Sequence, residues 1–186
     1  MDEYSGWLTF DPKSSSLDHF LQTSAPSRTP ATRCAWIAVR NPNATEMPGG
    51  DVHGVVAAFQ QMPDAQKSQE TLDILAHTYG VLCGKWMLFI KQENIDEVWA
   101  KIARAVVAGE LGPSAKVSPY GAQQNGCHLI CVYTDNFTDE MDVLRVRQKL
   151  YDLEFNGKLN YKPDLYTYCD IYSKNPWKIQ ASRYRM

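Results

Sequence analysis

One lysine stands inside a short apolar stretch where its charge would have little contact with water. Lys116 lies between Ala115 and Val117 in a segment typical of a strand, and strand alternation puts Ser118 on the same side. A lysine held inside a sheet needs a carboxylate or a bound anion to compensate its charge. Two interpretations follow: an ion pair with Asp164 or with a glutamate on a helix, or a site for a negatively charged ligand.

The C-terminal segment, residues 156–186, is both basic and aromatic. It has a net charge of +4, whereas residues 1–80 have a net charge of −4. Its rings are Tyr161, Tyr166, Tyr168, Tyr172, Trp177 and Tyr184. Rings that stack on bases, interleaved with cations that meet phosphates, are typical of sites for nucleotides and single-stranded nucleic acid. The alternative is that the tyrosines fill a sheet and the lysines solvate its outer face.

From these patterns we expect a ligand site in which Lys116 and Lys162 contact phosphate oxygens. Tyr161, Tyr166 or His77 would stack on the base or hydrogen-bond it. Because His77 has apolar neighbours in a helical stretch, a partly buried structural histidine is the alternative there. An enzymatic interpretation would use His77, Lys116 and Asp164 as acid–base groups.

Motifs for covalent chemistry and for cofactors are missing from the sequence. It contains no Gly-x-Ser-x-Gly turn, no Walker loop and no Gly-x-Gly-x-x-Gly fingerprint. Cys127 and Cys131 share a strand face, but two thiols without a second pair fall short of a zinc site. We therefore expect no cofactor and no metal, and the sequence favours a binding protein over an enzyme.

Size and composition describe one globular domain. The chain has 186 residues, a net charge of −2 and a pI near 6.1, which excludes a binder of nucleic acid that is strongly basic over its whole length. We expect an N-terminal arm over residues 1–33 and a single domain over residues 34–186. No apolar run is long enough to cross a membrane, and the N-terminus does not resemble a secretory signal. Five cysteines, an odd number, then favour reduced thiols and a cytoplasmic or nuclear protein.

Hydrophobic periodicity predicts the elements. We expect helices at 16–23, 52–61, 68–80, 94–109 and 139–155, and strands at 34–40, 84–91, 115–118, 128–133, 158–161 and 165–172. The two strands on either side of the turn-rich loop 119–126 should pair antiparallel. This order predicts an α+β fold in which the helices pack on one face of an antiparallel sheet and leave the other face able to bind a ligand.

Several segments resemble a known eukaryotic family. They are Gly84-Lys85-Trp86-Met87-Leu88, the helix over 96–109, Ala115-Lys116-Val117-Ser118-Pro119, the run from Ile130 to Asp139, and Tyr161-Lys162-Pro163-Asp164-x-Tyr166-Thr167-Tyr168. They resemble the basophilic-leukaemia-expressed protein family, a family of unknown function, over nearly the whole stretch from Trp36 to Tyr184. The resemblance implies a fold similar to the cap-binding translation initiation factor, a curved antiparallel sheet with helices on its convex face.

The same resemblance limits what ligand to expect. The initiation factor holds a methylated guanine between two tryptophans on loops at its concave face. Here the loop 41–50 has no aromatic residue, and residues 72–83 offer only His77 and Tyr79, so that pair of tryptophans is absent. We expect Trp86 and Trp99 in the core. The predicted function is a non-catalytic binding module for RNA or a nucleotide-like anion on the concave face, and the alternative is an adaptor that binds a protein through its helical face.

Overall fold

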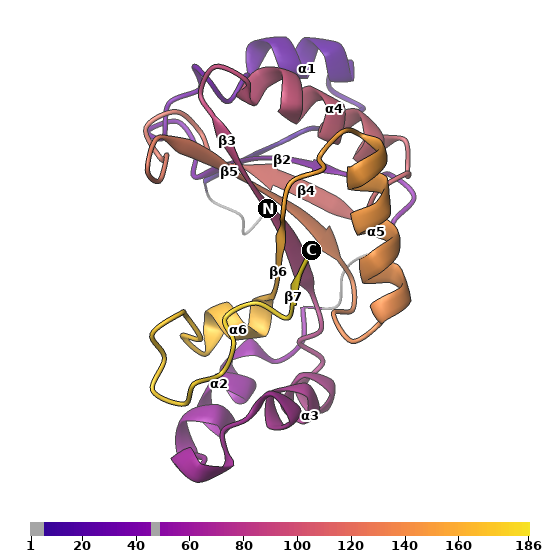
Figure 1. The fold of residues 1–186 in the computed structure, drawn as a ribbon. Coiled ribbons are helices and arrows are strands. Elements are labelled where there is room, and N and C mark those ends of the chain that lie inside the picture. The colour runs from indigo at the N-terminus through magenta and orange to yellow at the C-terminus, as the bar shows by residue number, and fades with distance from the viewer. Residues whose placement is uncertain (1–5, 46–48) are drawn as a thin grey trace.

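A computed structural model describes residues 6–45 and 49–186, and Figure 1 shows its fold. The strands are β1 (Trp7–Thr9), β2 (Trp36–Arg40), β3 (Gly84–Lys91), β4 (Ser114–Val117), β5 (Cys127–Thr134), β6 (Asn160–Pro163) and β7 (Tyr184–Arg185). The helices are α1 (Leu17–Thr23), α2 (Val52–Gln61), α3 (Gln69–Tyr79), α4 (Ile95–Val107), α5 (Glu140–Asp152) and α6 (Asp164–Tyr168), with a 3₁₀ turn at Asp64–Gln66. The α+β class predicted from the sequence is confirmed.

All seven strands form one sheet in the order β1-β2-β4-β5-β3-β6-β7. Every neighbouring pair is antiparallel except β1 and β2, which are parallel. The pairing of β4 with β5 across loop 119–126 is the antiparallel pair that the sequence predicts. Strands β3 and β5, of eight residues each, are the longest, and they pair along their whole length near the middle of the sheet.

The helices form two groups. Helices α4 and α5 lie along one face of the sheet, and α1 packs on α4 (Figure 1). Helices α2, α3 and α6 gather at one end of the sheet, where α6 follows directly after β6 (Figure 1). The sequence predicts all helices on one face; the second group instead builds a wall at the end of the sheet.

Local signals explain most of the helix boundaries. The Asp51 side chain accepts a hydrogen bond from the Gly54 backbone at the start of α2, and the Ser68 side chain accepts one from the Thr71 backbone at the start of α3. Gly80 ends α3 in the left-handed conformation, with φ of 69°. At the start of α4, by contrast, the Asn94 side chain makes no capping hydrogen bond, although asparagine favours that position.

Two segments differ from their predicted structure. Residues 165–172, expected as a strand, form the short helix α6 and the turn after it, because the aromatic residues there lack the long alternation that separates strand from helix. Residues 7–9, expected within a docked arm, form β1 at the edge of the sheet. Helix α1 is present as expected, and the buried ring of Phe20 docks it against Phe10.

The core lies between the sheet and helices α4 and α5. Trp86 and Trp99 are fully buried in it, as expected, and Trp86 Nε1 donates to the Val143 carbonyl at 3.0 Å. Tyr161 packs edge-on against Trp86, and a Cβ atom on Gly84 would collide with the Tyr161 ring. Glycine is therefore required at the first position of β3.

The five cysteines are thiols and form no disulfide among the described residues. Within the described residues, no helix is long and apolar enough to cross a membrane.

Candidate functional site

The register of the sheet gathers the charges of its strands on one side. The seven strands contain six basic residues and no aspartate or glutamate: Arg40, Lys85, Lys91, Lys116, Lys162 and Arg185. Alternation and pairing place all six on the face opposite α4 and α5, because their neighbours along each strand are the core residues. We call this side the open face.

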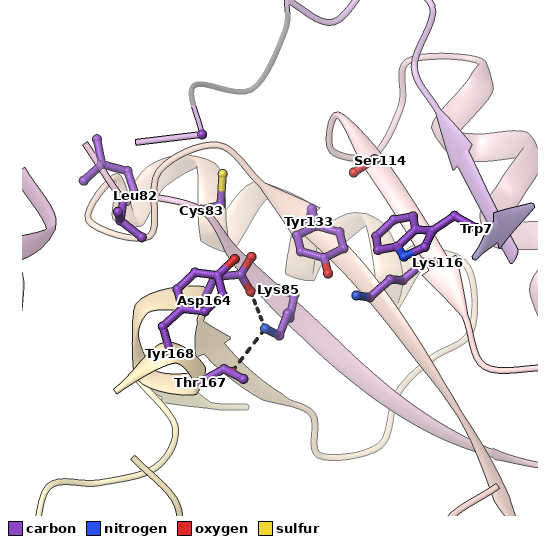
Figure 2. Close-up of a pocket in the computed structure, with 12 residues that line it drawn as sticks. Trp7, Leu82, Cys83, Lys85, Ser114, Lys116, Tyr133, Asp164, Thr167 and Tyr168 are labelled. Atoms are coloured by element: carbon purple, nitrogen blue, oxygen red, sulfur yellow. Dashed lines mark hydrogen bonds and ion pairs between the residues drawn. The ribbon is translucent and has the colours of Figure 1, made fainter. Parts of the chain in front are cut away.

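A cavity of about 330 Å³ lies on the open face where the sheet meets α6. Side chains from β1, β3, β4, β5 and α6 line it together with the segment before β3, and Figure 2 shows them. The lining residues are Trp7, Gly49, Val81, Leu82, Cys83, Lys85, Ser114, Lys116, Tyr133, Asp164, Thr167 and Tyr168. A volume of this size is in the range of small-molecule sites.

Lys116 lies among three aromatic rings in this cavity. Its Nζ is 4.1 Å from the ring centre of Trp36, 4.6 Å from that of Trp7 and 5.6 Å from that of Tyr133. In the described part of the chain, no carboxylate lies within 4.0 Å of this nitrogen. Burial lowers the pKa of Lys116, and the nearby charge of Lys85 lowers it further. We call Lys116 and its three rings, Trp7, Trp36 and Tyr133, the lysine–aromatic cluster.

A second lysine in the cavity is already paired. Lys85 Nζ forms an ion pair with Asp164 and lies 3.5 Å from Thr167 Oγ1 (Figure 2). The ion pair of Lys116 with Asp164 that the sequence allowed is therefore wrong, because Asp164 meets Lys85 instead. In the view of Figure 2, Tyr133 lies between the two lysines, and Trp7 lies on the same side of Tyr133 as Lys116.

Backbone packing holds Tyr133 at the floor of the cavity. A Cβ atom on Gly112 would collide with the Tyr133 carbonyl, so this glycine lets the loop before β4 approach β5. The Tyr133 side chain is buried, and burial raises the pKa of its hydroxyl. Burial also raises the pKa of the Cys83 and Cys131 thiols to about 11, so both remain protonated and unreactive at neutral pH.

Of the seven predicted site residues, two line the cavity: Lys116 and Asp164. Ser118 is buried, and its hydroxyl accepts a hydrogen bond from the Leu129 backbone at 2.9 Å, which is a structural role. His77 lies outside the cavity, where its Nε2 is 3.1 Å from Thr138 Oγ1. The acid–base trio of His77, Lys116 and Asp164 is thus not brought together.

The other three predicted residues are buried away from the cavity. Tyr161 and Tyr166 are fully buried in the core, and the Tyr161 hydroxyl is 2.6 Å from Thr134 Oγ1. Lys162 is on the open face but is only 6% exposed, with its Nζ 3.8 Å from the ring centre of Tyr172. Neither tyrosine presents a ring to a ligand, and the phosphate contact expected of Lys162 is not available in the cavity.

Sequence reasoning missed the rings around Lys116 and the second lysine. Trp7 lies in a strand of three residues, too short to leave a periodic pattern. Tyr133, by contrast, had a signal: alternation places it with Cys131, and Cys131 pairs with Lys116 across β4 and β5. Lys85 carried the same signal, because it pairs directly with Tyr133.

No metal site emerges in residues 6–45 and 49–186, where no three His, Cys, Asp or Glu side chains cluster in a way that could hold an ion. The cavity lining supplies ammonium groups, aromatic rings, the hydroxyls of Ser114 and Thr167, the Cys83 thiol, and one carboxylate, which is paired with Lys85.

Comparison with solved structures finds partial similarity to translation initiation factor complexes. C. elegans eIF4E-3 in complex with the 4E-binding protein Mextli and a cap analog is 17% identical, with a TM-score of 0.43, and the match covers 57% of this chain and 58% of that one. Ascaris suum eIF4E-3 with an m2,2,7G cap is 15% identical, with a TM-score of 0.42, at 57% and 58% coverage. The match thus spans less than two thirds of either chain.

Comparison with protein families gives a more specific result. The model of basophilic leukemia-expressed protein Bles03 matches residues 60–170, which include β3, β4, β5, β6 and the lysine at the centre of the cavity. The chain belongs to the Bles03 family.

Proposed function

We propose that this protein binds a nucleotide-like anion in the cavity on its open face, without catalysing a reaction on it. The observation that carries the proposal is Lys116, a largely buried ammonium group next to three rings and with no carboxylate partner among the described residues. A charge removed from water needs a counter-charge, and here a ligand would supply it.

The rings define the kind of anion. A small inorganic anion would meet the Lys116 ammonium but would gain nothing from the aromatic side chains of Trp7 and Tyr133. A ligand with a flat heterocycle and a phosphate uses both, because the ring stacks on an aromatic side chain while the phosphate meets the cation. A nucleoside phosphate has this combination of groups.

The second lysine would add to the attraction. Lys85 is held by Asp164 and Thr167 at the other side of Tyr133, so its position is fixed before any ligand arrives. A fixed cation binds an anion with little further loss of side-chain entropy. Because Asp164 already neutralises Lys85, most of the uncompensated positive charge in the cavity belongs to Lys116.

Isothermal titration with the four ribonucleoside 5′-monophosphates, and separately with inorganic phosphate, tests the proposal. We expect at least one nucleotide to bind more tightly than phosphate, and Lys116→Met to weaken its binding by about 10-fold or more, as for a hydrogen bond to a charged group. Lys174→Gln removes an exposed lysine outside the cavity and should leave affinity unchanged. Equal binding by wild type and Lys116→Met, or no binding at all, would contradict the proposal.

A further inference from the structure

We infer that the nucleotide is one unit of a longer ligand, and that the open face beyond the cavity is a track for single-stranded RNA. This inference rests on the proposed function, since it assigns the cavity to one nucleotide of a chain. We expect a polymer rather than a single nucleotide because the cations and rings that favour an anion continue past the cavity.

A row of paired residues crosses the open face from the cavity to the far edge. Lys116 pairs with Cys131, Cys131 with Met87, Met87 with Asn160, and Asn160 with Arg185. At the usual strand spacing, four steps separate the two cations by about 19 Å. Arg185 is exposed, and no described carboxylate pairs with it. Among the described residues, the row therefore has a cation without a carboxylate partner at each end, and Arg185 lies outside the cavity.

An exposed ring lies beside this row. Phe89 is two residues beyond Met87 on the same face of β3, and 51% of its surface is exposed. The exposed half of such a ring provides a flat surface on which any base can stack. Single-stranded RNA is commonly bound in this way, with bases on sheet aromatics and phosphates on flanking cations.

A second hollow, of about 380 Å³, lies next to this ring. Its lining includes Phe89, Lys158 and Asn160, at the point where β6 no longer accompanies β3. Glu154 also lines it, and this carboxylate forms an ion pair with Lys101. Lys158 is exposed and makes no ion pair with a described carboxylate. Like the first hollow, the second one thus combines a ring, a lysine without a described carboxylate partner, and a carboxylate that another lysine neutralises.

The charge pattern favours a polyanion over a peptide or a second protein. No aspartate or glutamate lies in any of the seven strands, and Asp164, at the edge of the face, is neutralised by Lys85. The acidic residues that the structure describes lie in the helices and loops instead, so this face is basic although the whole chain has a net charge of −2. A negatively charged strand is the ligand that matches such a face.

The test compares a fluorescein-labelled eight-residue oligouridylate with uridine 5′-monophosphate, using anisotropy and competition at two salt concentrations. We expect the oligomer to bind at least 10-fold more tightly than the monomer. Phe89→Ala should weaken oligomer binding about 5-fold or more, the effect of losing one stacked base, and leave monomer binding within 2-fold. Arg185→Gln and Lys158→Gln should each reduce the slope of log affinity against log salt by about 0.7.

Met141→Ala is the matched control, because Met141 is 80% exposed on α5, on the opposite side of the sheet. An oligomer that binds no better than the monomer overturns the track and leaves the nucleotide site standing. An unchanged oligomer affinity in Phe89→Ala, or equal competition by heparin, overturns it as well, since either means attraction to charge alone. Loss of monomer binding in Lys116→Met tests the proposed function separately.

Discussion

Two regions of this molecule both combine aromatic rings with cations but use them differently. The C-terminal segment 156–186 joins rings and cations, and those that lie against the rest of the fold have partners inside the protein. Arg183 Nη2 is 2.9 Å from Asp73, and Trp177 Nε1 donates to Asp64 at 2.8 Å. In the lysine–aromatic cluster, the cation has rings around it but no described carboxylate.

The difference shows that partners, rather than composition, separate a structural segment from a candidate binding site. Where each charge meets an opposite charge and each ring is covered, the residues hold the chain together. Where a buried cation has no counter-charge, the fold carries a cost that a ligand can remove. Four substitutions test this distinction.

The largest effect is expected in the C-terminal segment, at a ring that the protein uses for itself. Tyr161 is fully buried and contacts the rings of Trp86 and Tyr184 edge-on. Tyr161→Ala should lower the free energy of unfolding by about 3–5 kcal/mol, because it leaves a cavity in the core. Urea denaturation followed by tryptophan fluorescence measures the change.

Tyr161→Phe is the matched control for this ring. It keeps the packing and removes only the hydroxyl that lies 2.6 Å from Thr134 Oγ1, so we expect a loss of about 1 kcal/mol. If Tyr161→Ala were no more destabilising than Tyr161→Phe, the ring would not be part of the core, and its assignment as structural would fail.

The fold was largely predictable from the sequence, whereas the site was predictable only in part. Helix α4 and strand β3 have long, regular patterns, and their boundaries were predicted closely. Lys116 was found because a charge in a short apolar strand is unusual. Trp7, however, reaches it through a parallel pairing of three residues, and sequence periodicity holds no information on which strands become neighbours.

The second-largest effect is expected at the paired cation of the same segment. Arg183 and Asp73 are both more than half buried, and breaking the pair from one side leaves the other charge without a partner. Arg183→Met should lower the free energy of unfolding by about 1–2 kcal/mol. In a double-mutant cycle with Asp73→Asn, the two effects should not add; additive effects would mean that the ion pair contributes nothing.

Lys162 is expected to make the free energy of unfolding depend on pH, by about 1 kcal/mol. Burial, with the neighbouring charge of Lys85, lowers the pKa of Lys162 to about 8, below its ordinary value. Between that value and the ordinary lysine pKa, the folded state binds fewer protons than the unfolded state, so stability from this group rises with pH. From pH 7 to pH 9, we expect wild type to gain about 1 kcal/mol relative to Lys162→Gln.

Urea denaturation of both proteins at each pH measures that gain. The difference between wild type and Lys162→Gln isolates this one group, because the cysteine thiols titrate equally in both proteins. Lys174→Gln, which changes an exposed lysine of the same segment, should follow wild type at every pH. Parallel pH profiles for wild type and Lys162→Gln would show that Lys162 is not desolvated by Tyr172 and its surroundings.

The smallest expected change in the free energy of unfolding is in the lysine–aromatic cluster, and there the substitution should stabilise the protein. Lys116→Met keeps the length of the side chain and its contact with Trp36, but it removes a charge that burial disfavours. We therefore expect this variant to be more stable than wild type by about 0.5 kcal/mol while it binds the nucleotide more weakly. A stabilising change at one cation and a destabilising change at Arg183 would separate the two regions by their energetics. If Lys116→Met destabilised the protein as Arg183→Met does, Lys116 would have a partner inside the protein, and the cavity would lose its need for an anion.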